Sequence, residues 1–163
     1  MRARILLETS SLVSERKYRG DRLVRPWVEH LAAHVTGGPL TSVVISPAGE
    51  VELQPLAREE AEARLTELLA AWDEGMRRPL PLAVKTALAW LNGGATAARK
   101  EYEGDGFKQK GEVDRSDYLR RLWPRFDQLT EGGGFQRLAD HLLGPLQQAV
   151  HVKAEGKGKE QDQ

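Results

Sequence analysis

Residues 41–54 read TSVVISPAGEVELQ, and this stretch decides how the chain is organised. The runs 41–46 and 50–54 are rich in β-branched side chains, and they lie on either side of Pro47-Ala48-Gly49. Proline and glycine are typical turn residues, and β-branched side chains suit a pleated strand. The pattern therefore predicts a β-hairpin.

Towards the N-terminus, residues 3–8 form a compact apolar run closed by three hydroxyl side chains. The run is too short for a helix, so it predicts a short buried strand. From Asp21 to Ala33, apolar residues recur at helical spacing until the sequence Gly37-Gly38-Pro39. This segment predicts a helix with Asp21 as a plausible N-cap. Pro26 lies one turn inside it and should kink the helix or delay its start.

After the hairpin the period of the apolar residues is helical. Residues 57–77 predict a strongly amphipathic helix, and residues 82–91 predict a second helix ended by Asn92-Gly93-Gly94. Further helices are expected at 116–126 and 135–149, and the charged, glycine-rich residues 103–112 predict an exposed loop. The stripe expected on the 57–77 helix consists of Ala61, Leu65, Leu68, Leu69 and Trp72.

The length and the order of elements predict one domain over 1–150, followed by a disordered tail over 151–163. A chain of 163 residues can bury roughly two-thirds of its unfolded surface around a single core. The expected fold class is α/β (α+β), with a short sheet and hairpin packed by several helices. No internal repeat is found.

Composition limits the classes of partner and site. The 24 Lys and Arg residues equal the 24 Asp and Glu residues, so any nucleic-acid contact must come from a local basic patch. The absence of cysteine removes disulfides and thiolate chemistry and suits a reducing compartment. The apolar run 5–7 is too short for a signal peptide or a membrane span. We therefore expect a cytoplasmic protein without membrane contact.

Motifs for catalysis or cofactors are weak. His30 and His34 have the i, i+4 spacing of zinc-binding helices, but no Glu lies between them and no third ligand is indicated. Packing or surface histidines are the favoured interpretation. Gly132-Gly133-Gly134 lacks the Lys-Ser/Thr ending of a phosphate-binding loop. The sequence thus predicts no cofactor and no metal.

Basic residues gather between the first strand and the first helix. They alternate with one aromatic ring, a composition suited to phosphate contact and base stacking. Glu15 and Asp21 dilute the patch, and an ordinary solvated loop is the competing interpretation. The candidate DNA-binding residues are Arg16, Lys17, Tyr18, Arg19, Arg22 and Arg25.

Several segments, in order along the chain, resemble the C-terminal domain of the RecC family, the gamma subunit of exodeoxyribonuclease V or RecBCD helicase-nuclease. The resemblance extends over nearly the whole range 3–146. The segments that carry it are DRLVRPWVEHL (21–31), WDEGMRRPLPL (72–82), KTALAWL (85–91), ARKEY (98–102), GEV (111–113), DYLRRLW (117–123) and ADHLLGPL (139–146).

The resemblance implies a partial PD-(D/E)XK nuclease-like core without its active site. In active members a strand carries Asp/Glu-x-Lys, where the carboxylate binds metal and the lysine assists the attacking water. Here Glu8 could occupy the carboxylate position, but Ser10 stands in place of the lysine. The resemblance further implies RecB and RecD as partners, with double- and single-stranded DNA inside the complex. We expect a non-catalytic scaffold and DNA-guiding domain.

Two alternatives stay open at the level of sequence. One is a degenerate metal-dependent nuclease using Glu8 with Glu15 and Lys17. The other is a pure interaction module without DNA contact, in which tryptophans cover a subunit interface, although ordinary core packing is the favoured interpretation of them. These tryptophans are Trp27, Trp72, Trp90 and Trp123.

Overall fold

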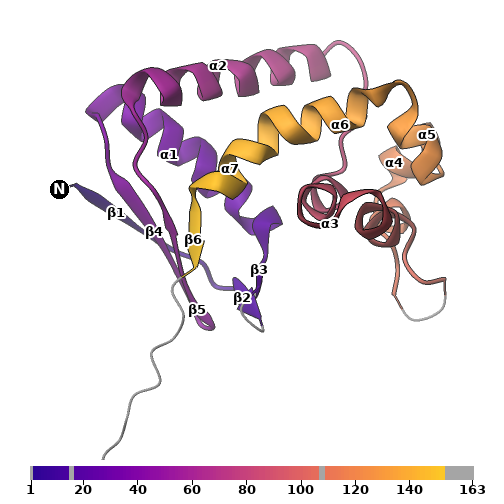
Figure 1. The fold of residues 1–163 in the computed structure, drawn as a ribbon, viewed down its shortest axis with the longest axis horizontal. Helices are drawn as coiled ribbons and strands as arrows, with labels where there is room; N and C mark the ends of the chain where they lie inside the picture. Colours follow the sequence, from indigo (N-terminus) through magenta and orange to yellow (C-terminus); the bar gives the residue numbers. More distant parts are fainter. Residues whose placement is uncertain (1, 15–16, 107–108, 153–163) are drawn as a thin grey trace, which may run out of the picture.

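The computed structural model describes residues 2–14, 17–106 and 109–152. A four-stranded sheet has the order β1-β4-β5-β6, formed by β1 Ala3–Leu7, β4 Thr41–Ser46, β5 Gly49–Leu53 and β6 Val150–Val152. Strand β1 runs parallel to β4, whereas the other neighbours are antiparallel (Figure 1). The β4–β5 pair confirms the predicted hairpin.

The expectation of a buried first strand is wrong. Strand β1 lies at one end of the sheet in the described part of the chain, and Ile5 and Leu7 are 66% and 82% exposed. The register pairs Leu6 with Val44 and Val44 with Val51, so these residues share the face that carries the core. Ile5 and Leu7 lie on the opposite face because side chains alternate along a strand.

Helix α1 Val24–Gly37 connects the parallel strands β1 and β4. It packs against α2 Arg58–Gly75, and both helices lie along the same side of the sheet (Figure 1). A short pair of strands, β2 Val13–Ser14 and β3 Lys17–Tyr18, and the 3₁₀ turn η1 Gly20–Leu23 precede α1. The α-helix therefore starts later than Asp21, with Pro26 in its first turn, where an N–H is not needed.

The second half of the chain is helical. Helix α3 Val84–Glu103 is interrupted at Gly94, which has φ 67° and ψ −160°. The predicted end at Asn92-Gly93-Gly94 is thus present in the backbone, but helix resumes directly after it. The remaining elements are η2 Val113–Arg115, α4 Asp117–Leu122, α5 Phe126–Thr130, η3 Glu131–Gly133, α6 Gly134–Leu138, the π-helix η4 Ala139–Leu143 and α7 Gly144–Ala149.

Two hydrophobic cores result, one in each half, and the partly buried Val24 and Leu68 border both. The mixed α/β class is confirmed. The expected domain boundary at 150 falls inside β6, because residues 150–152 pair with β5, and residues 153–163 lie outside the described residues. No helix in the described ranges is both long enough and apolar enough to cross a membrane.

Candidate nucleic-acid interface

The six residues expected to contact DNA lie between β2 and the first turn of α1. Arg16 lies outside the described residues, and for Lys17 the structure describes the backbone, which pairs with Ser14. Tyr18 is half-buried and packs against the core of the sheet half, and burial raises its pKa. Its ring is therefore partly engaged in packing.

Arg19 and Arg22 are exposed on a loop whose backbone is hydrogen-bonded. The Arg19 amide donates to the Leu12 carbonyl at 2.7 Å, and the Arg22 amide donates to the Arg19 carbonyl at 3.0 Å. Neither guanidinium has a carboxylate within ion-pair distance among the residues described. Neither charge is therefore part of an ion pair among the residues described, although Arg22 lies close enough to Glu8 for its charge to lower the pKa of that carboxyl.

Arg25 differs from Arg19 and Arg22 because its charge is compensated. Its Nε lies 3.0 Å from Glu29 Oε1, while Arg4 donates to Glu29 Oε2 at 2.6 Å. The hydrogen bonds from Arg25 and then from Arg4 lower the pKa of Glu29. Arg25 remains highly exposed, but the carboxylate of Glu29 offsets part of its positive charge. The structure thus brings Arg19, Arg22 and Arg25 to one loop and helix start, with Arg25 partly neutralised.

Glu8, the residue expected at a nuclease carboxylate position, closes a local turn at the end of β1. Its Oε1 accepts a hydrogen bond from the Ser10 amide at 3.0 Å. This bond, together with the charge of Arg22, lowers the pKa of Glu8. Glu15 and the Lys17 side chain lie outside the described residues. Within the described ranges, no three His, Cys, Asp or Glu side chains gather in a way that could hold a metal.

His30 and His34 are fully buried in α1, which agrees with the packing interpretation. His34 Nε2 accepts hydrogen bonds from the amides of Leu40 and Leu56, at 3.3 Å and 3.1 Å. Its Nδ1 lies 2.8 Å from the His30 carbonyl and must donate to it. His34 is therefore a neutral imidazole. Its hydrogen bonds connect α1 to the segment before β4 and to the segment before α2.

Both ring nitrogens of His30 also have hydrogen-bond partners. Its Nε2 lies 3.0 Å from the Gln54 carbonyl, which only accepts, so the proton is on Nε2 and Nδ1 accepts from the Ser42 hydroxyl at 2.8 Å. Burial, together with the nearby His34, lowers the pKa of His30 to about 4. Both ring nitrogens of each histidine are engaged, so neither ring is available to a metal.

The hydrophobic stripe expected on residues 57–77 is only partly buried. Leu69 and Trp72 are 58% and 65% exposed, and Met76 beside them is 70% exposed, so this part of the stripe is uncovered and core packing does not hold for Trp72. Of the four tryptophans, Trp27 is buried, Trp90 and Trp123 pack partly buried against the helical core, and Trp72 stands out of the surface. Sequence periodicity places a residue on a helix face but does not say how far that face is covered.

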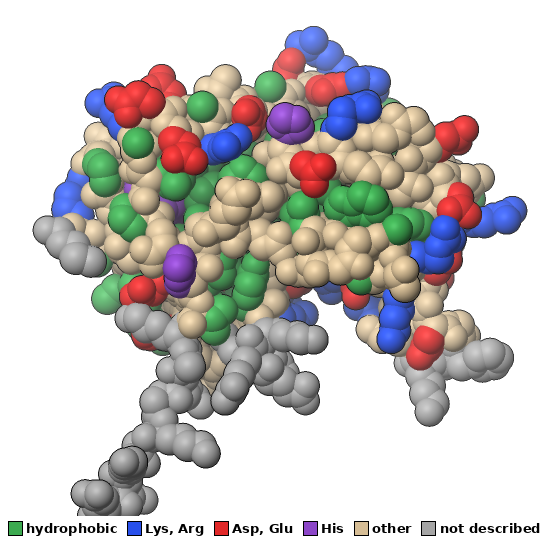
Figure 2. Space-filling model, viewed as in Figure 1, with side chains coloured by type: hydrophobic (Ala, Val, Ile, Leu, Met, Phe, Trp, Pro, Cys, Tyr) green, Lys and Arg blue, Asp and Glu red, His purple; other side chains and the backbone are tan. Residues whose placement is uncertain are grey.

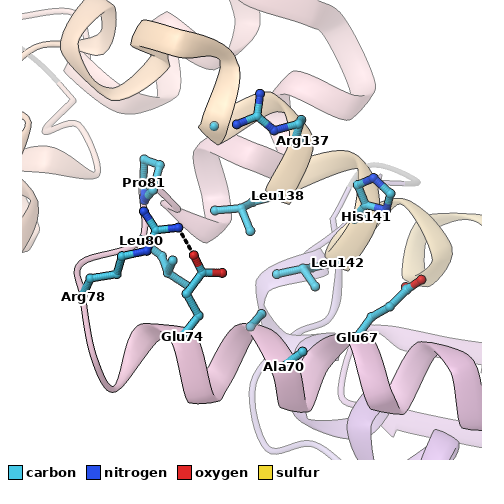
Figure 3. A pocket seen from close by; sticks show the side chains of 12 residues that line it. Glu67, Ala70, Glu74, Arg78, Leu80, Pro81, Arg137, Leu138, His141 and Leu142 are labelled. Carbon is cyan, nitrogen blue, oxygen red and sulfur yellow. Dashed lines mark hydrogen bonds and ion pairs between the residues drawn. The ribbon is translucent and has the colours of Figure 1, made fainter.

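A groove of about 610 Å³ lies between α2 and the helices α6 and η4 (Figure 3). Leu138 and Leu142 point into it from above, Ala70 lies on its floor, and an ion pair between Arg78 and Glu74 closes one end. Acidic side chains outnumber basic ones along α2, and on the face shown in Figure 2 the two signs are interspersed. No sequence motif predicts this groove, because the residues that line its two sides are far apart in the sequence.

Comparison with known proteins points to one family. A sequence model described as the RecC C-terminal domain matches residues 2–95. The matched range covers the parallel pair β1–β4, both helices packed on the sheet, and the first part of α3. No curated protein matches the chain.

Proposed function

Because this chain belongs to the RecC C-terminal domain family, we propose that it acts as a non-catalytic domain of a RecBCD-type helicase-nuclease. In this proposal it packs on RecB and RecD and helps to line the path of DNA during repair of double-strand breaks, in the cytoplasm. The assignment to the complex rests on family membership. The exposed charges on the loop before α1 support the contact with DNA.

The sheet supports a partial nuclease-like core in this proposal. A strand, a crossover helix and a parallel strand are followed by an antiparallel strand, and Glu8 lies at the end of the first strand. Serine at position 10 cannot supply the ammonium group that such chemistry uses, and Glu8 already accepts the Ser10 amide. We therefore propose that the domain does not cleave DNA. Metal-dependent cleavage that disappears in Glu8→Ala would support the nuclease alternative instead.

Arg19 and Arg22 are the residues that we assign to phosphate contact. Both are exposed, neither forms an ion pair among the described residues, and hydrogen bonds hold the backbone between them. A cation in this state gains more from a phosphate than one already paired with glutamate, as Arg25 is. The proposal thus reduces six sequence candidates to two principal contacts.

The test starts with co-purification of this chain with RecB and RecD subunits from the same source, followed by a salt-titrated DNA-binding assay on the assembly. Arg19→Glu with Arg22→Glu should weaken binding and lower the slope of log K against log salt by about 0.9 for each lost phosphate contact. Arg120→Glu with Arg121→Glu, a matched reversal on α4, should change neither. Unchanged binding in the first double variant would contradict the DNA-guiding role.

A specific observation favours interaction without DNA as a second candidate function. The exposed stripe of Leu69, Trp72 and Met76 follows helical spacing along one flank of α2. Buried aromatic side chains are frequent anchors of protein interfaces. Under this alternative Trp72→Ala abolishes association with the other subunits, while Arg19→Glu with Arg22→Glu leaves DNA binding by the assembly unchanged. Under the leading proposal the arginine variant alone reduces DNA binding.

A further inference from the structure

A cavity of about 750 Å³ lies between Tyr18 of β3 and helix α3. On the helix it is lined by Ala89, Gly93 and Ala97, and these small residues leave space between α3 and the tyrosine ring. A Cβ atom at Gly93 would lie only 2.8 Å from the Cβ of Ala97, so the backbone itself keeps this side low. The volume is in the range of cavities that bind small aromatic ligands.

The turn after Tyr18 is packed against the same helix. Gly20 is buried, and a Cβ atom there would lie 3.0 Å from Leu88 Cδ1 and 3.3 Å from Tyr18 Cε2. The next residue, Asp21, forms an ion pair with Lys85 near the start of α3, with 3.8 Å between Oδ2 and Nζ. The cavity and the backbone that carries Arg19 and Arg22 therefore belong to one packed unit.

Two polar side chains of α3 line the cavity in different states. The Asn92 amide is held in place, because its Nδ2 donates to the Leu88 carbonyl at 2.8 Å and its Oδ1 accepts from Gln147. Lys100 is exposed and forms no ion pair among the described residues. A ligand thus meets a fixed amide and a cation that lacks a carboxylate in ion-pair contact.

Glu101 is the acidic side chain among the residues that line the cavity. Burial, and then the charge of Glu112, raises the pKa of its carboxyl. The carboxyl consequently takes up a proton more readily than an exposed glutamate when an anion approaches. Together with Asn92 and Gln109 it offers donors and acceptors to the edge of a ligand ring.

Resting on the DNA-guiding role proposed above, we propose that this cavity takes one unstacked base of single-stranded DNA. The base lies against Tyr18, while Arg19 and Arg22 contact the phosphates beside it. Aromatic side chains bind the π-face of every base, and cations follow the backbone of the strand. Tyr18 and Arg19 are adjacent, with Cα atoms about 3.8 Å apart, so one nucleotide can reach both. A paired base inside a duplex stays stacked and does not enter.

NMR spectra of the full chain locate the base during titration with a short single-stranded oligothymidylate. We expect shifts of the Arg19 and Arg22 amides and also of the Gly93 and Ala97 amides. A strand of the same length, made of abasic sites, should shift the arginine amides alone. A duplex of the same length should leave the α3 amides unshifted, because its bases remain stacked.

Filling the cavity tests the same site by affinity, measured as fluorescence anisotropy of labelled strands. The oligothymidylate should bind roughly tenfold more tightly than the abasic strand, as expected for stacking of one base. Ala97→Trp should abolish this preference because the indole occupies the cavity. Ala63→Trp, at an exposed alanine of α2, is the matched control and should retain it. Arg19→Glu with Arg22→Glu should weaken binding of both strands and retain the preference.

Tyr18 is tested with two variants because its ring also packs against the core of the sheet half. Tyr18→Phe keeps the ring, so it should retain more of the preference than Tyr18→Ala. Circular dichroism checks that each variant is folded. Equal loss in two folded variants would contradict stacking on this ring.

Three results would overturn the proposal. They are equal affinity for the oligothymidylate and the abasic strand, a full preference in Ala97→Trp, or unshifted Gly93 and Ala97 amides at saturation. If binding still weakens in Arg19→Glu with Arg22→Glu, these results remove the base site and leave the phosphate contact standing. If no strand shifts the arginine amides either, the base site and the DNA contact of this loop both fail.

Discussion

The two halves of the molecule are held together in different ways. The helical half packs aromatic rings edge to face, with Phe135 between Trp90 and Phe126 at centroid distances of 6.1 Å and 6.2 Å. The sheet half packs mainly aliphatic side chains and adds a buried polar layer around His30 and His34. The comparison shows that edge-to-face aromatic packing distinguishes the first core, and that buried histidine hydrogen bonds distinguish the second.

The two halves also differ in which of their apolar side chains are covered by other elements. The helical half buries Tyr102, Phe126 and Phe135 among its own helices, and the Tyr102 hydroxyl donates a hydrogen bond to the Trp123 carbonyl at 2.6 Å. Among the described residues, the sheet half leaves Ile5 and Leu7 of β1 exposed on the face of the sheet opposite its core. Exposed apolar side chains therefore lie on β1 and along α2 in the sheet half, and at Tyr118 and Leu122 of α4 in the helical half.

The largest expected effect comes from opening the aromatic core. Phe135 is fully buried, so Phe135→Ala removes its packing and leaves a cavity. We expect a loss of about 3–5 kcal/mol in the free energy of unfolding, measured by urea denaturation. Tyr118→Ala, at a half-exposed ring on α4, is the control and should cost less than about 1 kcal/mol.

Hydrogen exchange on Phe135→Ala would sharpen the comparison further. If the two cores are separate cooperative units, protection should fall in α3 to α6 and persist in β4 and β5. Equal loss in both halves would show that the shared border at Val24 and Leu68 couples them into one unit.

The next effect tests the polar layer of the sheet half. His34→Ala removes the acceptor of the Leu40 and Leu56 amides and leaves a buried gap. Unpaired buried amides and lost packing together should cost about 2–4 kcal/mol in the free energy of unfolding. His141→Ala, at an exposed histidine, should change it by less than about 0.5 kcal/mol. A small effect at His34 would mean that the hydrogen bonds matter less than the aliphatic packing.

Acid should weaken the sheet half through His30. The pKa of this histidine is lowered to about 4 by burial, so at intermediate pH the unfolded chain binds a proton that the folded chain does not. Its contribution is complete above about pH 6.5 and falls with decreasing pH, by about 2 kcal/mol between pH 6.5 and 4.5. The difference in slope between wild type and His30→Gln, from denaturation at several pH values, isolates this contribution. Parallel slopes would contradict it.

The smallest of these effects concerns the start of α3 in the helical half. Glu112 accepts hydrogen bonds from the Lys85 and Thr86 amides at 3.2 Å and 2.8 Å, and from the Thr86 hydroxyl at 2.8 Å. It therefore caps the start of α3 from a distant segment. Glu112→Ala should cost about 1–2 kcal/mol in unfolding free energy, and Glu112→Gln should retain part of the capping. Glu131→Ala at an exposed site serves as the control.

Local sequence signals predicted most of the elements. The hairpin at 41–54 and the helix at 57–77 are present with small shifts, and the Gly94 break lies where the glycines are. The helical run after Gly94 was missed because glycines normally end a helix, whereas Gly94 adopts a positive φ that lets a new helix begin.

The candidate site was predicted less completely. Sequence alone selected the basic loop, but it could not show that Glu29 neutralises Arg25 while Arg19 and Arg22 stay unpaired within the described residues. It also favoured core packing for Trp72 and a buried strand at residues 3–8, and both expectations are wrong. Periodicity indicates which residues share a face, whereas exposure depends on which other element covers that face.

By itself, the sequence determined the hairpin, the main helices, the local basic loop and the family resemblance, because each depends on residues close together along the chain or on their order. Only the tertiary structure decided that β1 lies at one end of the sheet in the described part of the chain. It alone decided that both ring nitrogens of His30 and His34 are hydrogen-bonded in the core, and that Glu112 caps α3. These features depend on distant segments meeting, such as β1 with β4 or residue 112 with residues 85–86. The stabilisation that these features give comes from buried surface and hydrogen bonds, which form only when the chain is folded.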